Sequence, residues 1–193
     1  MSHSPRRQVA TLISLLALSG LVACGDNEPG DGPAAGGSPS ADGLTTPGSA
    51  LRVGETATVT RDGAGEVLEV TITRIDEGSS SDLAGLGRPA SARQTPFFVH
   101  YELRHVSGDS PYLPIHHFLS AWAGDTQLDG LAIFEPFPLC QEETFRADVA
   151  AGTTVEGCAT YLSGKGEAPL DRLQLSYGDD YDAFDGHQIT WER

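Results

Sequence analysis

Two stretches of the chain alternate between apolar and polar side chains with a period of two. In the first, Leu68, Val70 and Ile72 are separated by Glu69 and Thr71. In the second, residues 97–104, the apolar positions are Phe97, Val99, Tyr101 and Leu103. Successive side chains of a strand point to opposite faces, so each stretch predicts a strand with one buried face. The polar partners in the second stretch, His100, Glu102 and Arg104, are expected to face solvent.

Shorter runs of the same kind predict further strands. They cover residues 56–61, 118–123, 153–162, 173–177 and 188–191. Turn-forming residues separate them at 62–65, 107–111 and 151–152. No window of a dozen residues has helical spacing. The pattern therefore predicts an all-β domain, most simply an antiparallel β-sandwich, with an up-and-down barrel as the alternative.

Four segments carry a family resemblance: VGETA at 53–57, VTITRI at 70–75, FVHYELRHVSG at 98–108 and AGTTVEGC at 151–158. Together they resemble the immunoglobulin-like domains of actinobacterial and firmicute extracytoplasmic lipoproteins, a group to which the mycobacterial immunoprotective secreted antigen is related. The resemblance covers most of residues 51–177. It implies an immunoglobulin-like β-sandwich at the cell surface and brings no established activity with it. His105 departs from the pattern, because an asparagine is common at that position.

The N-terminus has the layout of an export signal. Arg6 and Arg7 precede a mostly apolar run over residues 9–22, and small residues lead into Cys24. The run is shorter than the roughly 20 residues that span a bilayer. Leu-Val-Ala directly before Cys24 resembles the lipobox of bacterial lipoproteins, which implies cleavage before Cys24 and a diacylglycerol on its sulfur. A structural role for Cys24 is the weaker alternative, because the polar residues that follow cannot pack a core.

The chain accordingly divides into three parts. Residues 1–23 are the expected signal peptide. Residues 24–50 are the lipidated cysteine and a linker rich in Gly, Ser and Pro, whose composition buries too little apolar surface to fold and predicts disorder. Residues 51–193 have the size of one ordinary domain and are assigned to the sandwich.

The charge of the chain restricts its partners. The formal net charge is −15, and the signal peptide removes two arginines and no acidic residue, so the exported part is more acidic still. Such a surface repels nucleic acid and anionic lipid. We therefore expect no nucleic-acid partner and a membrane contact made through the acyl anchor at Cys24.

Two cysteines remain once Cys24 is assigned to lipid. An even remainder in an exported chain predicts a disulfide between Cys140 and Cys158. The alternative is a metal held by the two thiols together with His116 or His117. Adjacent residues of a strand face opposite sides, so His116 and His117 could not chelate together there.

The other candidate metal sites are no stronger. His100 and His105 would also face opposite ways on a regular strand, and the histidines are expected to be surface or half-buried residues. The part of the chain after Cys24 contains no methionine, which counts against a copper(I) site. The acidic run at 179–186 lacks the glutamate spacing of helix–loop–helix calcium sites and predicts a solvated turn between the last two strands. No metal and no cofactor are expected.

Recognisable catalytic motifs are absent from the sequence, including those of serine hydrolases, zinc proteases and phosphate-binding loops. We therefore expect a non-enzymatic binding or envelope-assembly module, lipid-anchored on the extracytoplasmic face of the membrane, with an envelope protein or a glycan as partner. Candidates for a binding patch are apolar loop residues next to prolines: Tyr112, Leu113, Phe134 and Phe137, beside Pro111, Pro114, Pro136 and Pro138. The alternative is that these rings close the ends of the core.

The competing class is an envelope enzyme that uses a carboxylate pair, for example on glycans. Two carboxyl groups facing each other in a concave groove would favour the enzyme, whereas a closed sandwich would favour the binding module.

Replacing Cys24 by serine tests the anchor. Because the acyl chain is added to the cysteine sulfur, Cys24→Ser should block processing and leave the uncut precursor, which intact-mass measurement detects. Normal cleavage of the variant, with unchanged partitioning into detergent, would contradict the lipoprotein interpretation.

Overall fold

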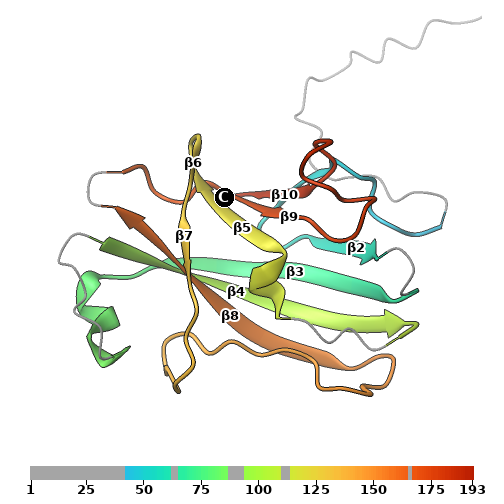
Figure 1. Cartoon of the computed structure of the whole chain (residues 1–193), viewed down its shortest axis with the longest axis horizontal. Coiled ribbons are helices and arrows are strands. Elements are labelled where there is room, and N and C mark those ends of the chain that lie inside the picture. The colour runs from blue at the N-terminus through green and yellow to red at the C-terminus, as the bar shows by residue number, and fades with distance from the viewer. Residues whose placement is uncertain (1–41, 62–64, 87–93, 110–113, 165–166) are drawn as a thin grey trace, which may run out of the picture. The chain divides into compact units, whose positions relative to one another are not determined.

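The structure, a computed structural model, describes residues 42–61, 65–86, 94–109, 114–164 and 167–193. In these residues two five-stranded sheets pack against each other (Figure 1). The first sheet has the order β1 (Ala50–Arg52), β10 (Ile189–Glu192), β9 (Arg172–Leu175), β5 (Leu119–Ala123) and β6 (Thr126–Gln127). The second has the order β2 (Thr56–Thr60), β3 (Val67–Glu77), β4 (Gln94–Ser107), β8 (Thr154–Gly164) and β7 (Asp129–Leu131).

This arrangement confirms the all-β sandwich and excludes the barrel alternative. β1 and β10 pair in parallel, and the other recorded pairs are antiparallel. The helical elements of the described residues are two 3-10 segments, η1 (Ser80–Leu86) and η2 (Ile115–His117). Neither has the length or the apolar character to cross a membrane.

The two strands predicted from the alternating pattern, β3 and β4, form one wall of the core. Val70 lies opposite Leu103, and Ile72 lies opposite Tyr101, in the register of β3 against β4. The inward-facing residues of both strands are buried: Leu68, Val70, Ile72, Phe97, Val99, Tyr101 and Leu103. They meet Leu173, Leu175, Ile189 and Trp191 of the opposing sheet in a single cluster.

Polar ends of buried aromatic rings join the two sheets. Tyr161 on β8 donates its hydroxyl hydrogen to the Leu119 carbonyl on β5 at 2.7 Å. The indole N–H of Trp191 donates to the Glu55 carbonyl at 2.9 Å. Tyr177, which follows β9, donates to the carboxylate of buried Glu66 at 2.7 Å. A buried Tyr or Trp needs such a partner, so each bond allows a large apolar ring to be buried without an unpaired donor.

The folded region begins earlier than the expected boundary at residue 51. Thr45 is buried, and its N–H donates to the Thr58 carbonyl at 2.8 Å. The Thr58 N–H donates back to the Thr45 hydroxyl, and the Tyr181 hydroxyl donates to the Thr45 carbonyl. β1 also starts within the stretch assigned to the linker. Residues 42–50 are therefore held by backbone hydrogen bonds, which need none of the large apolar groups whose absence suggested disorder.

His105 corrects the expectation of surface or half-buried histidines. Its side chain is buried, with the ring edge-on to Phe145 at 6.3 Å and Nε2 3.1 Å from the Ser107 carbonyl. His100 lies on the outer face of the same strand, so the expected opposite orientation of the two residues is confirmed. The alternation of β4 continues to residue 105 and carries the histidine inward.

Alkaline titration tests the buried tyrosines. Burial raises the pKa of Tyr101, Tyr161, Tyr177 and Tyr181, that of Tyr181 to about 12. The unfolded chain ionises near pH 10, at about the ordinary tyrosine pKa, and so loses protons before the folded state does. Stability should therefore be complete below about pH 10 and fall as the pH rises above it. Urea unfolding across this range, followed with tyrosinate absorbance, measures the effect. Full ionisation near pH 10 in a chain that keeps its circular dichroism would contradict it.

Candidate functional site

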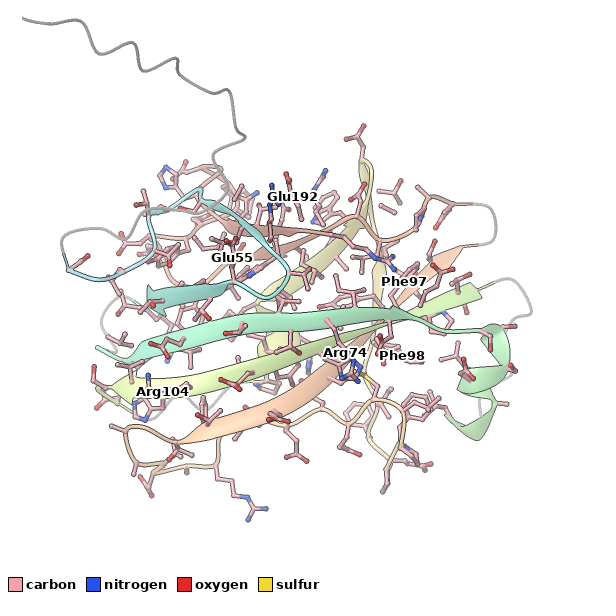
Figure 2. All side chains as sticks on the ribbon, turned by 180° about the vertical axis from the view of Figure 1, so that it is seen from behind. Glu55, Arg74, Phe97, Phe98, Arg104 and Glu192 are labelled. Atoms are coloured by element: carbon pink, nitrogen blue, oxygen red, sulfur yellow. A yellow bond between two sulfur atoms is a disulfide. The ribbon has the colours of Figure 1, made fainter. Side chains whose placement is uncertain are left out.

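A second, smaller apolar cluster lies on the outer face of the β4–β8 pair. Phe98, Phe137, Cys140 and Cys158 form it, and Leu86 and Ile133 pack against it half-buried. Phe98 follows Phe97 on β4 and points to the opposite side of the sheet (Figure 2). β4 therefore carries buried rings on both faces, and something other than the opposing sheet must cover Phe98.

The cover is the chain from the last residue of β7 to Glu142, residues 131–142, which we call the clamp loop. A disulfide joins Cys140 to Cys158 with a Cα–Cα distance of 5.0 Å, as the sequence analysis expected. The Phe137 ring packs against Phe98 with the ring centroids 6.0 Å apart. The Cys158 N–H donates to the Gln141 carbonyl at 2.9 Å. A covalent bond, a ring contact and a backbone hydrogen bond thus fix the clamp loop on the sheet.

A cavity of about 220 Å³ lies at the edge of β8 beside the clamp loop. Its lining is His116, Gly130, Leu131, Ala132, Ile133, Cys140, Glu142, Cys158, Ala159, Thr160 and Tyr161. A second hollow of about 190 Å³ shares Leu131, Ala132 and Ile133 with it and extends to Phe134 and Glu135. The apolar residues of the clamp loop therefore line both hollows.

Three side chains give the cavity a polar part. The Nδ1 of His116 is bonded to a carboxylate oxygen of Glu142. Thr160 is 3% exposed, and its hydroxyl oxygen has no hydrogen-bond partner among the described residues. Tyr161 contributes its ring, because its hydroxyl is bonded to the Leu119 carbonyl.

His100 flanks the disulfide on the same outer face and connects it to the Asp76–Arg74 ion pair. His100 Nε2 lies 3.9 Å from Cys158 Sγ and 3.1 Å from the Asp76 carboxylate. Arg74 bonds Asp76 at 2.8 Å, and this hydrogen bond is the main reason that the pKa of Asp76 is lowered. Burial, followed by the charge of Arg74, lowers the pKa of His100. The ring is therefore neutral at pH 7 and covers one side of the disulfide.

The clamp loop also exposes apolar surface. Phe134 is 93% exposed and Leu139 is 49% exposed, although neighbouring Phe137 is buried. Pro136 and Pro138 lie between them and are exposed as well. Prolines restrict the backbone, so these side chains are held outward on a stiff segment. Phe184, 99% exposed in the acidic turn, is a comparable ring on another loop.

The structure divides the sequence-predicted binding patch. Phe134 is exposed, whereas Phe137 is buried in the second cluster, outside the sandwich core whose ends these rings were alternatively expected to close. Pro111, Tyr112, Leu113 and Cys24 lie outside the described residues.

His116 and His117 lie in η2 and not on a strand, and their ring centroids are 4.2 Å apart. The expectation that they face opposite sides is therefore wrong, because a 3-10 turn replaces the strand geometry. The alternative in which the two thiols hold a metal with one of these histidines is also wrong, since the sulfurs are bonded to each other.

The acidic run at 179–186 forms turns between β9 and β10, where the sequence analysis placed it. Tyr181 is buried there against Thr45, and the carboxylate of Asp182 accepts the Phe184 N–H at 2.5 Å.

Sequence reasoning missed Glu142 and Thr160. His116 and Glu142 are 26 residues apart, and no local spacing connects them. Thr160 lies in a predicted strand, but alternation gives no reason to expect burial on both faces of β8.

Comparison of structures finds the same fold in a secreted protein from Mycobacterium tuberculosis, MPT63. The two share 11% sequence identity with a TM-score of 0.51, over 75% of this chain and 97% of that chain. The ycdA protein of Bacillus subtilis matches with 18% identity and a TM-score of 0.42, over 70% of this chain and 38% of that chain. No protein-family model and no curated protein matches the sequence. The likeness to MPT63 supports the β-sandwich fold.

Removing the disulfide should loosen the clamp loop. A Cys140→Ala/Cys158→Ala double variant opens a closed loop of 18 residues. On the chain-entropy model its free energy of unfolding should fall by about 3 kcal/mol, and denaturant unfolding measures this. Limited proteolysis should cut the clamp loop of the variant before that of the parent.

The control is the exported parent protein without reductant, in which alkylation should modify neither Cys140 nor Cys158. Two alkylatable thiols in that material, or unchanged unfolding of the double variant, would contradict the role given to the disulfide.

Proposed function

We propose that this protein is a lipid-anchored, extracytoplasmic binding module without catalytic activity, and that it binds a protein of the cell envelope through the clamp loop. The observation that carries the proposal is the contrast between Phe134 and Phe137. Phe137 and the disulfide fix the loop, while Phe134 extends into solvent three residues away. Aromatic residues on a rigid support lose little entropy on binding and often dominate the energy of an interface.

The position of the clamp loop supports this use. Figure 1 places the chain between β7 and β8 far from the first described residues, which enter the domain beside β10. A tether from Cys24 would reach the domain at that entry.

The alternative, an envelope enzyme that uses a carboxylate pair, has less structural support. Glu77 and Glu167 line a hollow of about 210 Å³. The carboxylate of Glu167, however, accepts the Gly164 N–H at 2.5 Å and the Ser163 hydroxyl at 3.4 Å. These bonds use it to hold the end of β8, so we favour the binding module. Glycan hydrolysis by the parent that disappears in Glu77→Gln and Glu167→Gln would reverse this preference.

Changing Phe134 to serine tests the binding role. The full processed protein in detergent serves as bait for proteins of its own membranes, and the captured partner is quantified. Phe134→Ser should capture roughly tenfold less of it, as expected for an exposed aromatic anchor. The fold should be unaffected, because the ring makes no core contact.

Phe184→Ser is the matched control, since it removes an equally exposed ring from a different loop. It should capture as much partner as the parent. Equal capture by both variants, or a loss confined to Phe184→Ser, would place the binding surface elsewhere.

A further inference from the structure

β7 is the last strand of the second sheet, and one side of it faces no other strand. The Cys158 N–H donates away from β4 to the Gln141 carbonyl, so the even-numbered residues of β8 direct their backbone groups toward β7. Thr160 is therefore the residue that bonds Leu131, its partner in the register of β7 against β8. The N–H and C=O groups of Gly130, the residue before Leu131, then point away from β8.

The outward backbone groups of β7 have no partner. Alternation places the backbone of Ala132, directly after the strand, on the same side as that of Gly130. Both residues are exposed, and within the part of the chain that the structure describes no loop carbonyl and no side chain bonds their backbones. The edge of β7 therefore offers two N–H and two C=O groups to another chain.

Two other sheet edges are closed by the chain itself. At the centre of β2, the Thr58 carbonyl accepts from the Thr45 N–H, and the Thr58 N–H donates to the Thr45 hydroxyl. In β1, the Arg52 N–H donates to the Glu55 carboxylate at 2.6 Å. Native edges are usually protected, because unpaired backbone groups can pair with another chain. The edge of β7 differs from these two, since a strand can still be added to it.

Gly130 fits the close approach of another backbone. A glycine within a strand costs stability, and it is explained by a positive φ, by a crowded position or by a second backbone that comes close. The φ of Gly130 is not positive. A Cβ on Gly130 would lie 3.7 Å from the Tyr161 ring, which is an ordinary contact. Close approach is the explanation that remains.

Charge and apolar surface define the strand that would be added. Asp129 and Glu135 lie at the two ends of the open segment, are exposed and belong to no ion pair among the described residues. These carboxylates and the formal net charge of −15 favour a basic segment over a second copy of this chain. Between them Leu131, Ala132 and Ile133 border both hollows, so there is unfilled space for apolar side chains.

We propose that the partner adds an extended segment to the edge of β7, in which apolar side chains are flanked by lysine or arginine. Its backbone bonds the outward groups of Gly130 and Ala132, and its basic residues lie near Asp129 and Glu135. In this mode of recognition the main-chain hydrogen bonds supply affinity, and side-chain contacts supply specificity. This inference rests on the proposed binding role of the clamp loop and names the part of the partner that binds.

The test uses a short peptide with the pattern that the edge selects. The full processed chain in detergent is titrated with acetyl-Lys-Val-Thr-Val-Thr-Val-Lys-amide, which has lysine at both ends and so suits either strand direction. The amide signals of Gly130 and Ala132 should shift, because both N–H groups become hydrogen-bonded. Their hydrogen exchange should slow with occupancy, by about tenfold when nine-tenths of the sites are filled.

Matched peptides separate the contributions of charge and backbone. Exchanging both lysines for glutamates keeps the strand pattern and should weaken binding by about fivefold or more. N-methylation of the valine amides and N-methylation of the threonine amides block opposite edges of the peptide, because successive amides of a strand point to opposite sides. One of the two modifications should abolish binding.

A pair of protein variants tests the same edge from the other side. Ala132→Pro removes an outward N–H that β8 does not use, so the sheet should stay intact and the affinity for the lysine peptide should fall about tenfold. Ala132→Ser keeps the N–H and should bind as the parent does. Intact disulfide and unchanged thermal unfolding verify the fold of both variants.

Unchanged amide signals of Gly130 and Ala132 at millimolar peptide overturn the proposal, as does equal affinity for the lysine and glutamate peptides. Binding that survives both N-methylations overturns it too. Protection of Gly130 that grows with the concentration of the chain alone would assign the edge to a second copy and contradict the proposal. Absence of peptide binding while Phe134→Ser still loses its partner would reject the edge assignment alone. Peptide binding with unchanged capture by Phe134→Ser would reject the proposed function alone.

Discussion

Burial of rings on both faces of one strand is the constraint on which the arrangement of this domain depends. β4 turns Phe97 into the sandwich and Phe98 outward, and both are buried. The opposing sheet covers the first ring but cannot reach the second. The chain between β7 and β8 must fold back over Phe98, and the disulfide keeps it there. The cavity and the exposed Phe134 both belong to this outer cover. The candidate site therefore exists because the clamp loop has to bury Phe98.

Hydrogen bonds from aromatic side chains determine how the two sheets meet. Tyr161, Tyr177 and Trp191 each donate from one sheet to the other sheet or its flanking chain. The apolar contacts alone would tolerate small sliding movements, but a donor that must find its acceptor does not. Tyr161 has a second role, because its ring also forms a wall of the cavity. The geometry of the site is thereby tied to the packing of the core.

The period-two pattern predicted the sandwich because strands with one buried face show it directly, and β3 and the inner face of β4 agree with it residue by residue. The same pattern cannot reveal burial on the second face. Phe98, Cys158 and Thr160 fall on positions that alternation assigns to solvent, and they form the base of the site. The pairing of His116 with Glu142 depends on the path of the clamp loop, which no local spacing encodes. The inclusion of residues 42–50 in the folded domain was missed for a related reason, since backbone hydrogen bonds do not appear in the pattern of apolar and polar residues.

The disulfide also determines when, after synthesis, the clamp loop becomes fixed. Thiols remain reduced in the cytosol, and disulfides close where the surroundings are oxidising. Before that step Cys140 is not bonded to Cys158, and the clamp loop is held by the Phe98–Phe137 contact and a few hydrogen bonds. The sandwich core does not include these cysteines, so it can assemble without them. The clamp loop is therefore fixed covalently only after the chain has reached an oxidising compartment, and until then its cover over Phe98 depends on non-covalent contacts alone.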